Sequence, residues 1–292
     1  MQFFLLCSHA LKSLKTLKSS VPLLLPPVQH RLHVRRSYDI MAASSSTMPV
    51  MISSVGIAVA SASVVNLVPT VSTLRLVTPA TFNSYVFLDL ETTGFITTED
   101  PICRITELSM WGIEREQFLN CSGKKMPRIT NRLNMCVDPS KEIHPMAATK
   151  SKLDNLNLSH QSPFDEDVAN TVLSFLNRLK KPMCMIAHYG FKFDFPVLKS
   201  EIANVGKDFS EDVFCADSLP VFRTCQSLAP GVPYSYTLEN VYRRIYNNQP
   251  EVMHEAEADV KMLFWAAAAT PRPFLNAVAN TAVPIATINK CW

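Results

Sequence analysis

The stretch FLDLETTG, residues 87–94, places two carboxylates, Asp89 and Glu91, at the end of an apolar run. Residues 85–88 are aromatic, β-branched or leucine, which predicts a short buried strand. Positions i and i+2 of a strand face the same side, so the two carboxylates point the same way. At this spacing they repel each other, and one binds a proton unless a cation compensates. These residues alone fit a metal site and a solvated strand end, turning at Gly94, equally well.

The composition is that of a globular protein with a sizeable core, since 47% of the 292 residues are hydrophobic and 18% are charged. The formal net charge is +3, but the charge is unevenly distributed. Residues 1–80 hold seven Lys and Arg and a single acid, whereas residues 81–292 hold 21 basic and 24 acidic side chains. Any binding of nucleic acid must therefore rest on local basic patches and metal ions, not on bulk charge.

The eight cysteines are scattered, with no CxxC pair and no His/Cys zinc spacing. A disulfide scaffold is not expected at this length, and reduced thiols indicate an intracellular compartment, the cytoplasm or the nucleus. The first 40 residues are rich in Lys, Arg, Ser and Leu, which also fits a mitochondrial transit segment.

Residues 50–68, VMISSVGIAVASASVVNLV, are apolar and long enough to cross a bilayer, which leaves membrane association open. The alternatives are a disordered extension, or residues upstream of a working start at Met41 or Met48. We predict three parts along the chain: an N-terminal extension at 1–80, disordered, targeting or membrane-proximal; a catalytic domain at 81–270; and a C-terminal tail at 271–292.

The pattern after residue 82 predicts an α/β domain in which strands alternate with helices. Apolar and β-branched runs predict strands at 85–88, 105–113, 132–137, 183–187 and 213–216. Apolar residues at helical spacing predict helices at 165–179, 195–205, 237–246 and 255–269. No element is predicted after Pro271.

A second acidic motif is AHYGFKFDFPVL, residues 187–198. A buried strand leads into His188 and Gly190, and Asp194 stands where a helix begins, with Pro196 in its first turn. Because Asp is a favoured N-cap, Asp194 taken alone fits helix capping as well as metal binding.

A third motif is HEAEADVKML, residues 254–263, in which His254 and Asp259 are five residues apart. This spacing fits a His on the incoming loop and an Asp one turn into the helix. The alternative is an acidic first turn that complements the helix dipole, with an incidental His254.

The three motifs together are more informative than any one of them. One strand and two helices of a single α/β unit supply four carboxylates, and such oxygen ligands suit Mg²⁺ or Mn²⁺. Two such ions about 4 Å apart clamp the attacking and leaving oxygens of phosphodiester hydrolysis. A histidine, here His254, can take the proton from the attacking water. The four carboxylates are Asp89, Glu91, Asp194 and Asp259.

FLDLETTG, HYGFKFDFPVL and HEAEADV resemble the three motifs of the DnaQ-like DEDDh exonuclease superfamily, and within it the three-prime repair exonuclease (TREX) family. ITELS at 105–109, DSLP at 217–220 and YTL at 236–238 resemble further segments of that family, so the resemblance covers residues 83–269. It implies an α/β fold with a ribonuclease H-like mixed β-sheet flanked by helices.

The resemblance also implies an activity. Family members of this type are homodimers that act as 3′→5′ DNA exonucleases on single-stranded or frayed 3′ ends and release nucleoside 5′-monophosphates. Two Mg²⁺ ions per site are implied, and Mn²⁺ can substitute. The same fold in other branches acts on RNA, and a protein that only binds nucleic acid is a further alternative.

The resemblance implies roles for individual residues. Asp89 would bridge both metals, while Glu91, Asp194 and Asp259 would complete the coordination and His254 would be the general base. The backbone around Glu91 and Thr92 would hold the terminal nucleotide, Leu90 would pack near its base, and Phe193 would lie against the 3′-terminal residue. The basic residues that could contact the nucleic acid are Lys124, Lys125, Arg128, Lys150, Lys152 and Lys192.

Two positions depart from the family pattern. Tyr189 stands where the family usually has Asn, which puts substrate preference in doubt. Lys152 stands where an ITGL-like turn has glycine, so this turn is expected to differ.

Overall fold

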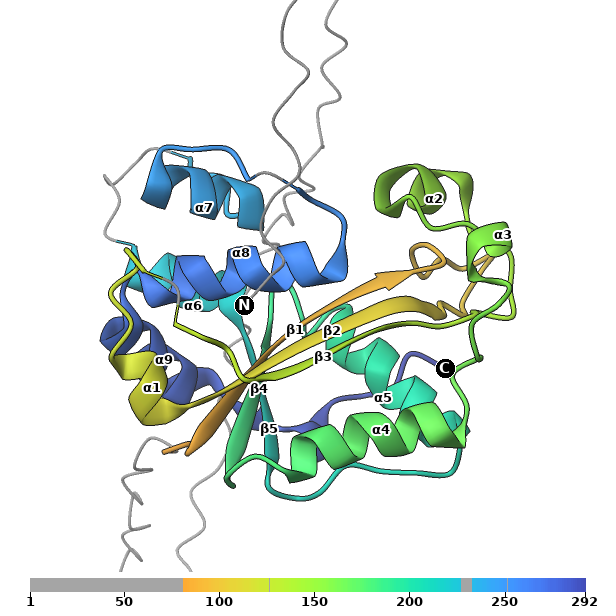
Figure 1. Cartoon of the computed structure of the whole chain (residues 1–292), viewed down its shortest axis with the longest axis horizontal. Coiled ribbons are helices and arrows are strands. Elements are labelled where there is room, and N and C mark those ends of the chain that lie inside the picture. Colours follow the sequence, from red (N-terminus) through yellow and green to blue (C-terminus); the bar gives the residue numbers. More distant parts are fainter. Residues whose placement is uncertain (1–80, 126, 227–232, 251) are drawn as a thin grey trace, which may run out of the picture. The chain divides into compact units, whose positions relative to one another are not determined.

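The computed structural model describes residues 81–125, 127–226, 233–250 and 252–292. These residues form a six-stranded mixed sheet with the strand order β3-β2-β1-β4-β5-β6 (Figure 1). The strands are β1 (Ser84–Thr92), β2 (Ile105–Glu114), β3 (Asn131–Cys136), β4 (Met183–Ala187), β5 (Val213–Asp217) and β6 (Val283–Pro284).

Helices cover both faces of this sheet, and Figure 1 shows α8 and α4 on opposite sides of it. The predicted mixed sheet flanked by helices is therefore confirmed. The helices of the described residues are α1 (Arg115–Leu119), α2 (Pro145–Ser151), α3 (Asn155–Leu158), α4 (Glu166–Asn177), α5 (Asp194–Asn204), α6 (Ser218–Cys225), α7 (Leu238–Tyr246), α8 (Ala256–Ala268) and α9 (Pro271–Thr281), with a short 3-10 turn at Ile285–Thr287.

The central strand β1 divides the core into two layers because its side chains alternate between the two faces of the sheet. Val86 and Leu88 pack in the layer that contains residues of α4 and α5. Tyr85 and Phe87 pack in the other layer, against α8 and α9. Asp89 and Glu91 continue the row of Phe87 by the same alternation, so they emerge on the face that α8 covers.

β1 extends further along the sheet than its parallel neighbour. Its pairing with β4 ends at Phe87 opposite Ile186, whereas its antiparallel pairing with β2 continues to Thr92. The prediction of a strand at 85–88 was therefore too short at the carboxyl end. The acidic residues lie on this extension, where β2 supports the backbone on one side and no strand of the described residues pairs on the other.

The expectation that no element follows Pro271 is wrong. Pro271 begins helix α9, where a missing N–H costs no hydrogen bond, so proline does not prevent the helix. Phe274 of α9 is fully buried, with its ring centroid 5.3 Å from that of Phe222 and 6.4 Å from that of Phe87. After α9, β6 pairs with β5, and Lys199 donates to the carbonyls of the segment that follows.

The short helices α1, α2, α3 and α6 were not predicted, because four to eight residues give too little periodicity to recognise. The predicted N-terminal extension at 1–80 and the apolar segment at 50–68 lie outside the described residues and stay predictions. Within the described part of the chain, no helix combines the length and the apolar character needed to cross a membrane.

The burial of Phe274 gives a test of the tail's place in the core. Phe274→Ala should lower the free energy of unfolding of the full chain by about 3–5 kcal/mol, because it leaves a cavity between aromatic rings. Leu156→Ala is the control: this side chain is 83% exposed, and the change should stay within about 0.5 kcal/mol. Denaturant unfolding followed by circular dichroism measures both. Equal stability of the two variants would contradict the assignment of α9 to the core.

Candidate active site

The two carboxylates of β1 are held in a place that disfavours their charge. Burial raises the pKa of Asp89 well above its ordinary value, and the nearby Asp194 and Asp259 raise it further. Burial, followed by Asp259, raises the pKa of Glu91 to about 8. Carboxylates that repel each other in a buried place require either protons or a cation, so the solvated strand end is not what the structure contains.

Asp194 joins this group from the first residue of α5. It is 4% exposed, and the N-cap of the helix is Phe193, so the alternative of simple capping does not describe it. Burial raises the pKa of Asp194 to about 7, while a hydrogen bond from the Leu90 backbone lowers it. This hydrogen bond is available because Leu90 lies on the part of β1 that has passed the end of β4.

His254 and Asp259 approach from the start of α8. The backbone N–H of His254 donates to Oδ2 of Asp259 at 3.0 Å, and His254 has a left-handed φ of 62°. One ligand atom each of Glu91, His254 and Asp259 lie within 4.8 Å of one another, close enough to share a metal ion. Burial raises the pKa of Asp259 to about 6, and the hydrogen bond and the charge of His254 lower it.

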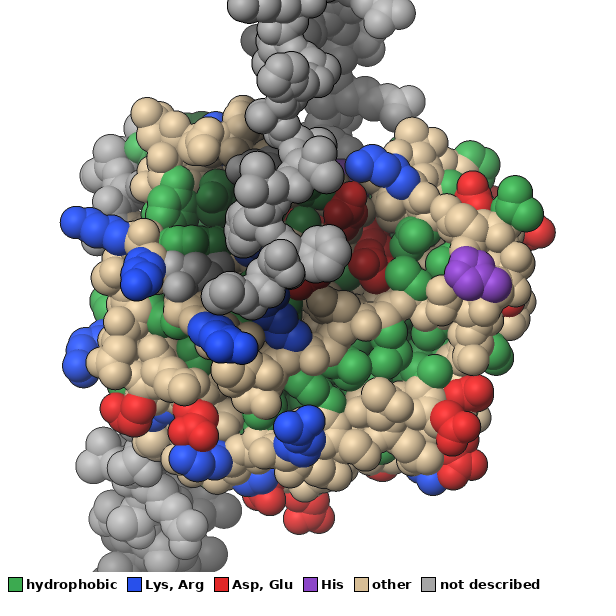
Figure 2. Space-filling view, in the orientation of Figure 1, with side chains coloured by type: hydrophobic (Ala, Val, Ile, Leu, Met, Phe, Trp, Pro, Cys, Tyr) green, Lys and Arg blue, Asp and Glu red, His purple; other side chains and the backbone are tan. Residues whose placement is uncertain are grey.

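The structure thus brings the five predicted catalytic residues to one end of the sheet. Asp89 and Glu91 come from β1, Asp194 comes from α5, and His254 and Asp259 come from the start of α8. Four acidic side chains and one imidazole, with no cationic side chain among them, are a donor set that suits a hard divalent cation. Figure 2 shows acidic side chains gathered in a hollow between the end of β1 and helix α8.

Glu107 of β2 supports this arrangement, a role that was not predicted. It lies opposite Glu91 in the β1–β2 register, and its Oε2 accepts the backbone N–H of Ala256 at 2.9 Å. It therefore fixes the start of α8, and with it His254, relative to β1. The ITELS segment, whose glutamate this is, was the available indication.

Asp217, at the end of β5, supports the turn that follows β4. Its carboxylate accepts backbone N–H groups from Tyr189 at 3.0 Å, Phe191 at 3.4 Å and Leu219 at 2.9 Å. The turn that leads into Asp194 is therefore tied to the neighbouring strand. His188 in the same turn lies 2.8 Å from Ser218 Oγ and 2.9 Å from the Tyr236 carbonyl, through its two ring nitrogens.

The predicted substrate-contact residues divide into two groups. Leu90 and Phe193 line a cavity of about 450 Å³ together with Asp89 and Asp194. Thr92 is buried, and its hydroxyl donates to the Gly94 carbonyl at 3.0 Å, so its side chain shapes the turn after β1. The remaining residues that line this cavity are Phe95, Ile96, His188, Tyr189 and Lys192.

Three of the basic candidates lie near the acidic group. Lys192 lines the cavity, and the charge of Lys150 is close enough to lower the pKa of Glu91. Lys152 pairs with Glu255 at 3.5 Å and ends α2 with a left-handed φ of 62°. It therefore adopts the left-handed conformation that glycine adopts most easily.

The other basic candidates lie elsewhere. Lys124 and Lys125 follow Gly123, whose Cα is so close to Ala269 that an added Cβ would be 2.8 Å from its Cα. Ala269 is the C-cap of α8, whereas His254 precedes the N-terminus of that helix. Thirteen residues of helix, about 20 Å, separate the two ends. Arg128 is exposed on the same connection as Lys124 and Lys125.

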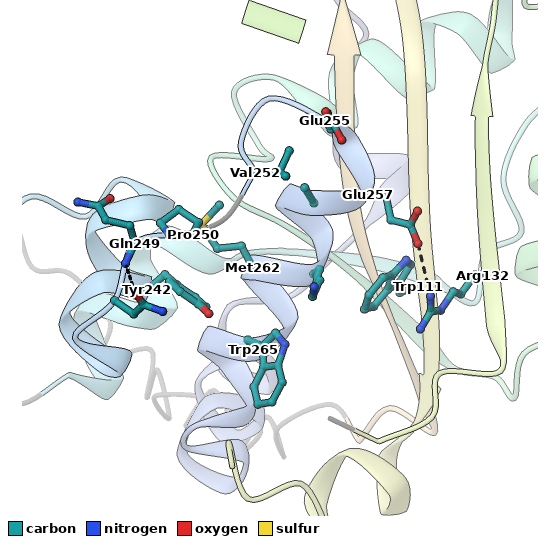
Figure 3. Close-up of a pocket in the computed structure, with 13 residues that line it drawn as sticks. Trp111, Arg132, Tyr242, Gln249, Pro250, Val252, Glu255, Glu257, Met262 and Trp265 are labelled. Carbon is teal, nitrogen blue, oxygen red and sulfur yellow. Dashed lines mark hydrogen bonds and ion pairs between the residues drawn. The ribbon is translucent and has the colours of Figure 1, made fainter. Parts of the chain in front are cut away.

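A second cavity, of about 580 Å³, lies on the outer side of α8 and contains none of the five catalytic candidates. Figure 3 shows Trp265 and Met262 of α8 between Tyr242 of α7 on one side and the β2–β3 edge on the other. On that edge the Arg132 guanidinium lies over the Trp111 ring, 4.2 Å from its centroid.

Comparisons with known proteins agree with this geometry. Residues 86–265 match the family model described as exonuclease (RNase_T). The chain is 32% identical to three-prime repair exonuclease 1 of Bos taurus, over 75% of this chain and 73% of that protein. It is 31% identical to three prime repair exonuclease 2 of Mus musculus, over 63% of this chain and 82% of that protein.

A solved structure of E. coli ExoI with ssDNA superposes with a TM-score of 0.53 at 18% identity. The match covers 66% of this chain and 42% of that one, so the chain spans less than half of the exonuclease I chain. At this identity the likeness concerns the fold, and it confirms the predicted ribonuclease H-like architecture.

The raised carboxyl pKa values predict how the metal-free protein responds to pH. Folded-state pKa values of about 8 for Glu91, 7 for Asp194 and 6 for Asp259 exceed the ordinary value of about 4. The folded state therefore binds more protons than the unfolded state in this range. Thermal unfolding in EDTA should show a melting temperature that falls as the pH rises from about 4 to about 8.

Removal of one charge from the group should reverse part of this loss. Asp89→Asn should raise the melting temperature of the metal-free protein at pH 8, by about 2–4 °C for each kcal/mol of relieved repulsion. Glu211→Gln is the control. This exposed acid precedes the first residue of β5, whereas Asp217, which supports the turn before Asp194, is the last residue of that strand. A melting temperature that rises with pH, or an Asp89→Asn variant no more stable than Glu211→Gln, would contradict the proposed repulsion.

Proposed function

The chain belongs to the three-prime repair exonuclease family, and on this premise we propose that it is a metal-dependent 3′→5′ DNA exonuclease. It would release nucleoside 5′-monophosphates from single-stranded or frayed 3′ ends. The observation that carries this proposal is the meeting of four carboxylates with His254 at the end of β1. Carboxylates that repel one another in this way favour the binding of divalent cations. Bound cations in turn interact with the phosphate oxygens of a nucleic-acid substrate.

The metal requirement follows from the family, and we propose the finer detail that two Mg²⁺ ions occupy the site. Asp89, Glu91, Asp194 and Asp259 would hold them, and Mn²⁺ would be able to substitute. Two bound ions would supply charge stabilisation for the attacking and leaving oxygens. The donor set fits this assignment, since oxygen ligands predominate and Glu91, His254 and Asp259 already have ligand atoms within 4.8 Å of one another.

The protein's own residues account for the proton transfers and the positioning. His254 lies outside the regular part of α8 and is exposed, so its ring can reach a water molecule near Glu91. In hydrolysis the water gives a proton to His254, and its oxygen forms a bond to the phosphorus of the terminal phosphodiester. The bond from phosphorus to the 3′ oxygen of the preceding nucleotide breaks, and that oxygen takes up a proton. Leu90 and Phe193 would contact the departing nucleotide from the cavity that they line.

The direct test is nuclease activity of the full chain on a 3′-labelled single-stranded DNA. We expect mononucleotide release that requires Mg²⁺ and stops in EDTA. His254→Asn should lower the rate by roughly 10²–10⁴-fold, because it removes the proton acceptor. Asparagine is chosen because it tolerates the left-handed φ of 62° better than alanine does.

The controls for this test separate the alternatives. His160→Ala alters an exposed histidine beside α3 that does not line the cavity of Asp89 and Asp194, and it should leave the rate unchanged. Faster attack on the matching RNA than on the DNA would move the activity to the exoribonuclease alternative. Binding of 3′ ends with no release from either would favour a protein that only binds nucleic acid.

We also propose that the protein is a homodimer. β3 is the edge of the sheet among the described residues, so one side of its backbone has no partner strand there. Val137 donates to the Thr106 carbonyl, so by alternation the N–H of Asn134 points outward. An edge of this kind can pair with a second copy of the same strand.

Light scattering would test the dimer. We expect a mass twice the 32.6 kDa of one chain. Asn134→Pro should reduce that mass to one chain, because proline removes an outward N–H and leaves the backbone bonds from β3 to β2 in place. It also removes the side-chain acceptor of Ser109 Oγ, 2.6 Å away, so Asn134→Ala, which loses the same acceptor but keeps the N–H, is the control and should remain a dimer. The mass of a single chain for the unaltered protein would exclude the homodimer.

A further inference from the structure

The turn after β4 carries one large side chain that the proposed hydrolysis leaves unused, and that is Tyr189. We propose that the ring of Tyr189 is a stacking surface for a nucleobase of the bound strand, at the mouth of the active-site cavity. This inference rests on the proposed nuclease function and assigns to it one substrate contact.

The backbone of Tyr189 is held in an uncommon conformation. Its φ is 65°, in the left-handed region that few residues with a bulky side chain adopt. Its N–H donates to Asp217 Oδ1 at 3.0 Å, and its carbonyl accepts the N–H of Lys192 at 3.1 Å. These two hydrogen bonds fix the backbone from which the ring projects. Residues held against a local preference in this way concentrate at functional sites.

The side chain of Tyr189, in contrast to its backbone, forms no hydrogen bond or ring contact with the described residues. Tyr189 is 55% exposed, and among the described residues its hydroxyl has no hydrogen-bond partner and its ring has no aromatic or cationic neighbour. Its neighbours in the turn differ, because the ring centroid of Phe191 is 5.6 Å from that of Phe195, and that of Phe193 is 6.0 Å from that of Phe95. Tyr189 is thus the aromatic residue of this turn that folding leaves free.

The ring of Tyr189 lies where the substrate is proposed to bind. Tyr189 lines the cavity of about 450 Å³ that also contains Asp89 and Asp194, the residues proposed to hold the metal ions. Lys192 lines the same cavity and supplies a positive charge for a phosphate. An aromatic face beside a basic group is the usual arrangement for binding single strands, because any base can stack on it. The contact would therefore be tolerant of sequence.

Two variants separate the ring from the backbone and from the hydroxyl. Tyr189→Asn removes the ring but keeps a residue that tolerates the left-handed φ of 65°, and it introduces the side chain usual in the family. Tyr189→Phe keeps the ring and removes the hydroxyl. We expect Tyr189→Asn to raise KM for single-stranded DNA roughly 5- to 100-fold with little change in kcat, and Tyr189→Phe to match the unaltered protein. Melting temperatures within a degree or two would show that both variants fold.

Substrates with an abasic site at one of the last three positions would locate the contact. At the stacked position, loss of the base should raise KM of the unaltered protein by about the same factor as Tyr189→Asn does, and should have no further effect on that variant. The KM change of Tyr189→Asn should not depend on salt, whereas that of Lys192→Ala should shrink as salt rises, since phosphate contacts depend on ionic strength.

Three results would overturn the proposal. The first is an unchanged KM in Tyr189→Asn while the unaltered protein degrades DNA, which leaves the nuclease function intact. The second is a KM for Tyr189→Phe as high as that of Tyr189→Asn, which would assign the contact to the hydroxyl. The third is that, at all three positions, Tyr189→Asn and the abasic site raise KM independently, so that their two factors multiply. Absence of nuclease activity in the unaltered protein would instead reject the proposed function, and the stacking role with it.

Discussion

Repulsion among carboxylates at the end of β1 is the constraint on which the rest of the site depends. Asp89, Glu91, Asp194 and Asp259 would move apart in a chain free to do so, and burial adds to the cost of their charge. Contacts from neighbouring elements hold them in place, although two of the supporting residues, Glu107 and Asp217, are acids that add to the repulsion. β2 supports the extension of β1, Asp217 ties down the turn before Asp194, and Glu107 fixes the start of α8. The fold therefore stores unfavourable electrostatic energy that a bound cation relieves.

The sequence predicted the acidic group because its members belong to a pattern with few explanations. Asp194 and Asp259 each had a simpler role open to them, as a cap or as a complement to a helix dipole. Only their order along the chain, with the strand of Asp89 and Glu91 first, favoured a common site. The main strands and long helices were predictable for a related reason, since each is marked by a run of apolar residues at strand or helix spacing.

The supporting residues could not be predicted in the same way, because their roles depend on contacts across the sheet. Glu107 acts through the backbone N–H of Ala256, 149 positions away in sequence, and no local pattern records such a bond. Helix α9 was missed because no clear element was recognised after Pro271, which is the first residue of that helix. Conversely, Lys124 and Lys125 satisfied the composition of a nucleic-acid contact, but Gly123 packs against the far end of α8 from His254.

The packing of α9 has a consequence for the order in which the nuclease matures during synthesis. All proposed catalytic residues have been synthesised once the chain reaches Asp259. The aromatic layer that packs on β1 is still incomplete at that point, because Phe274 belongs to α9, which is synthesised later. β5 also keeps an open edge until β6 arrives. Because domains fold as their residues leave the ribosome, the packing of α9 beneath the strand that carries Asp89 and Glu91 forms after the catalytic residues have been synthesised. A nascent chain still attached to the ribosome, among accessible nucleic acids, thus carries the catalytic side chains before it has the rigidity to align them.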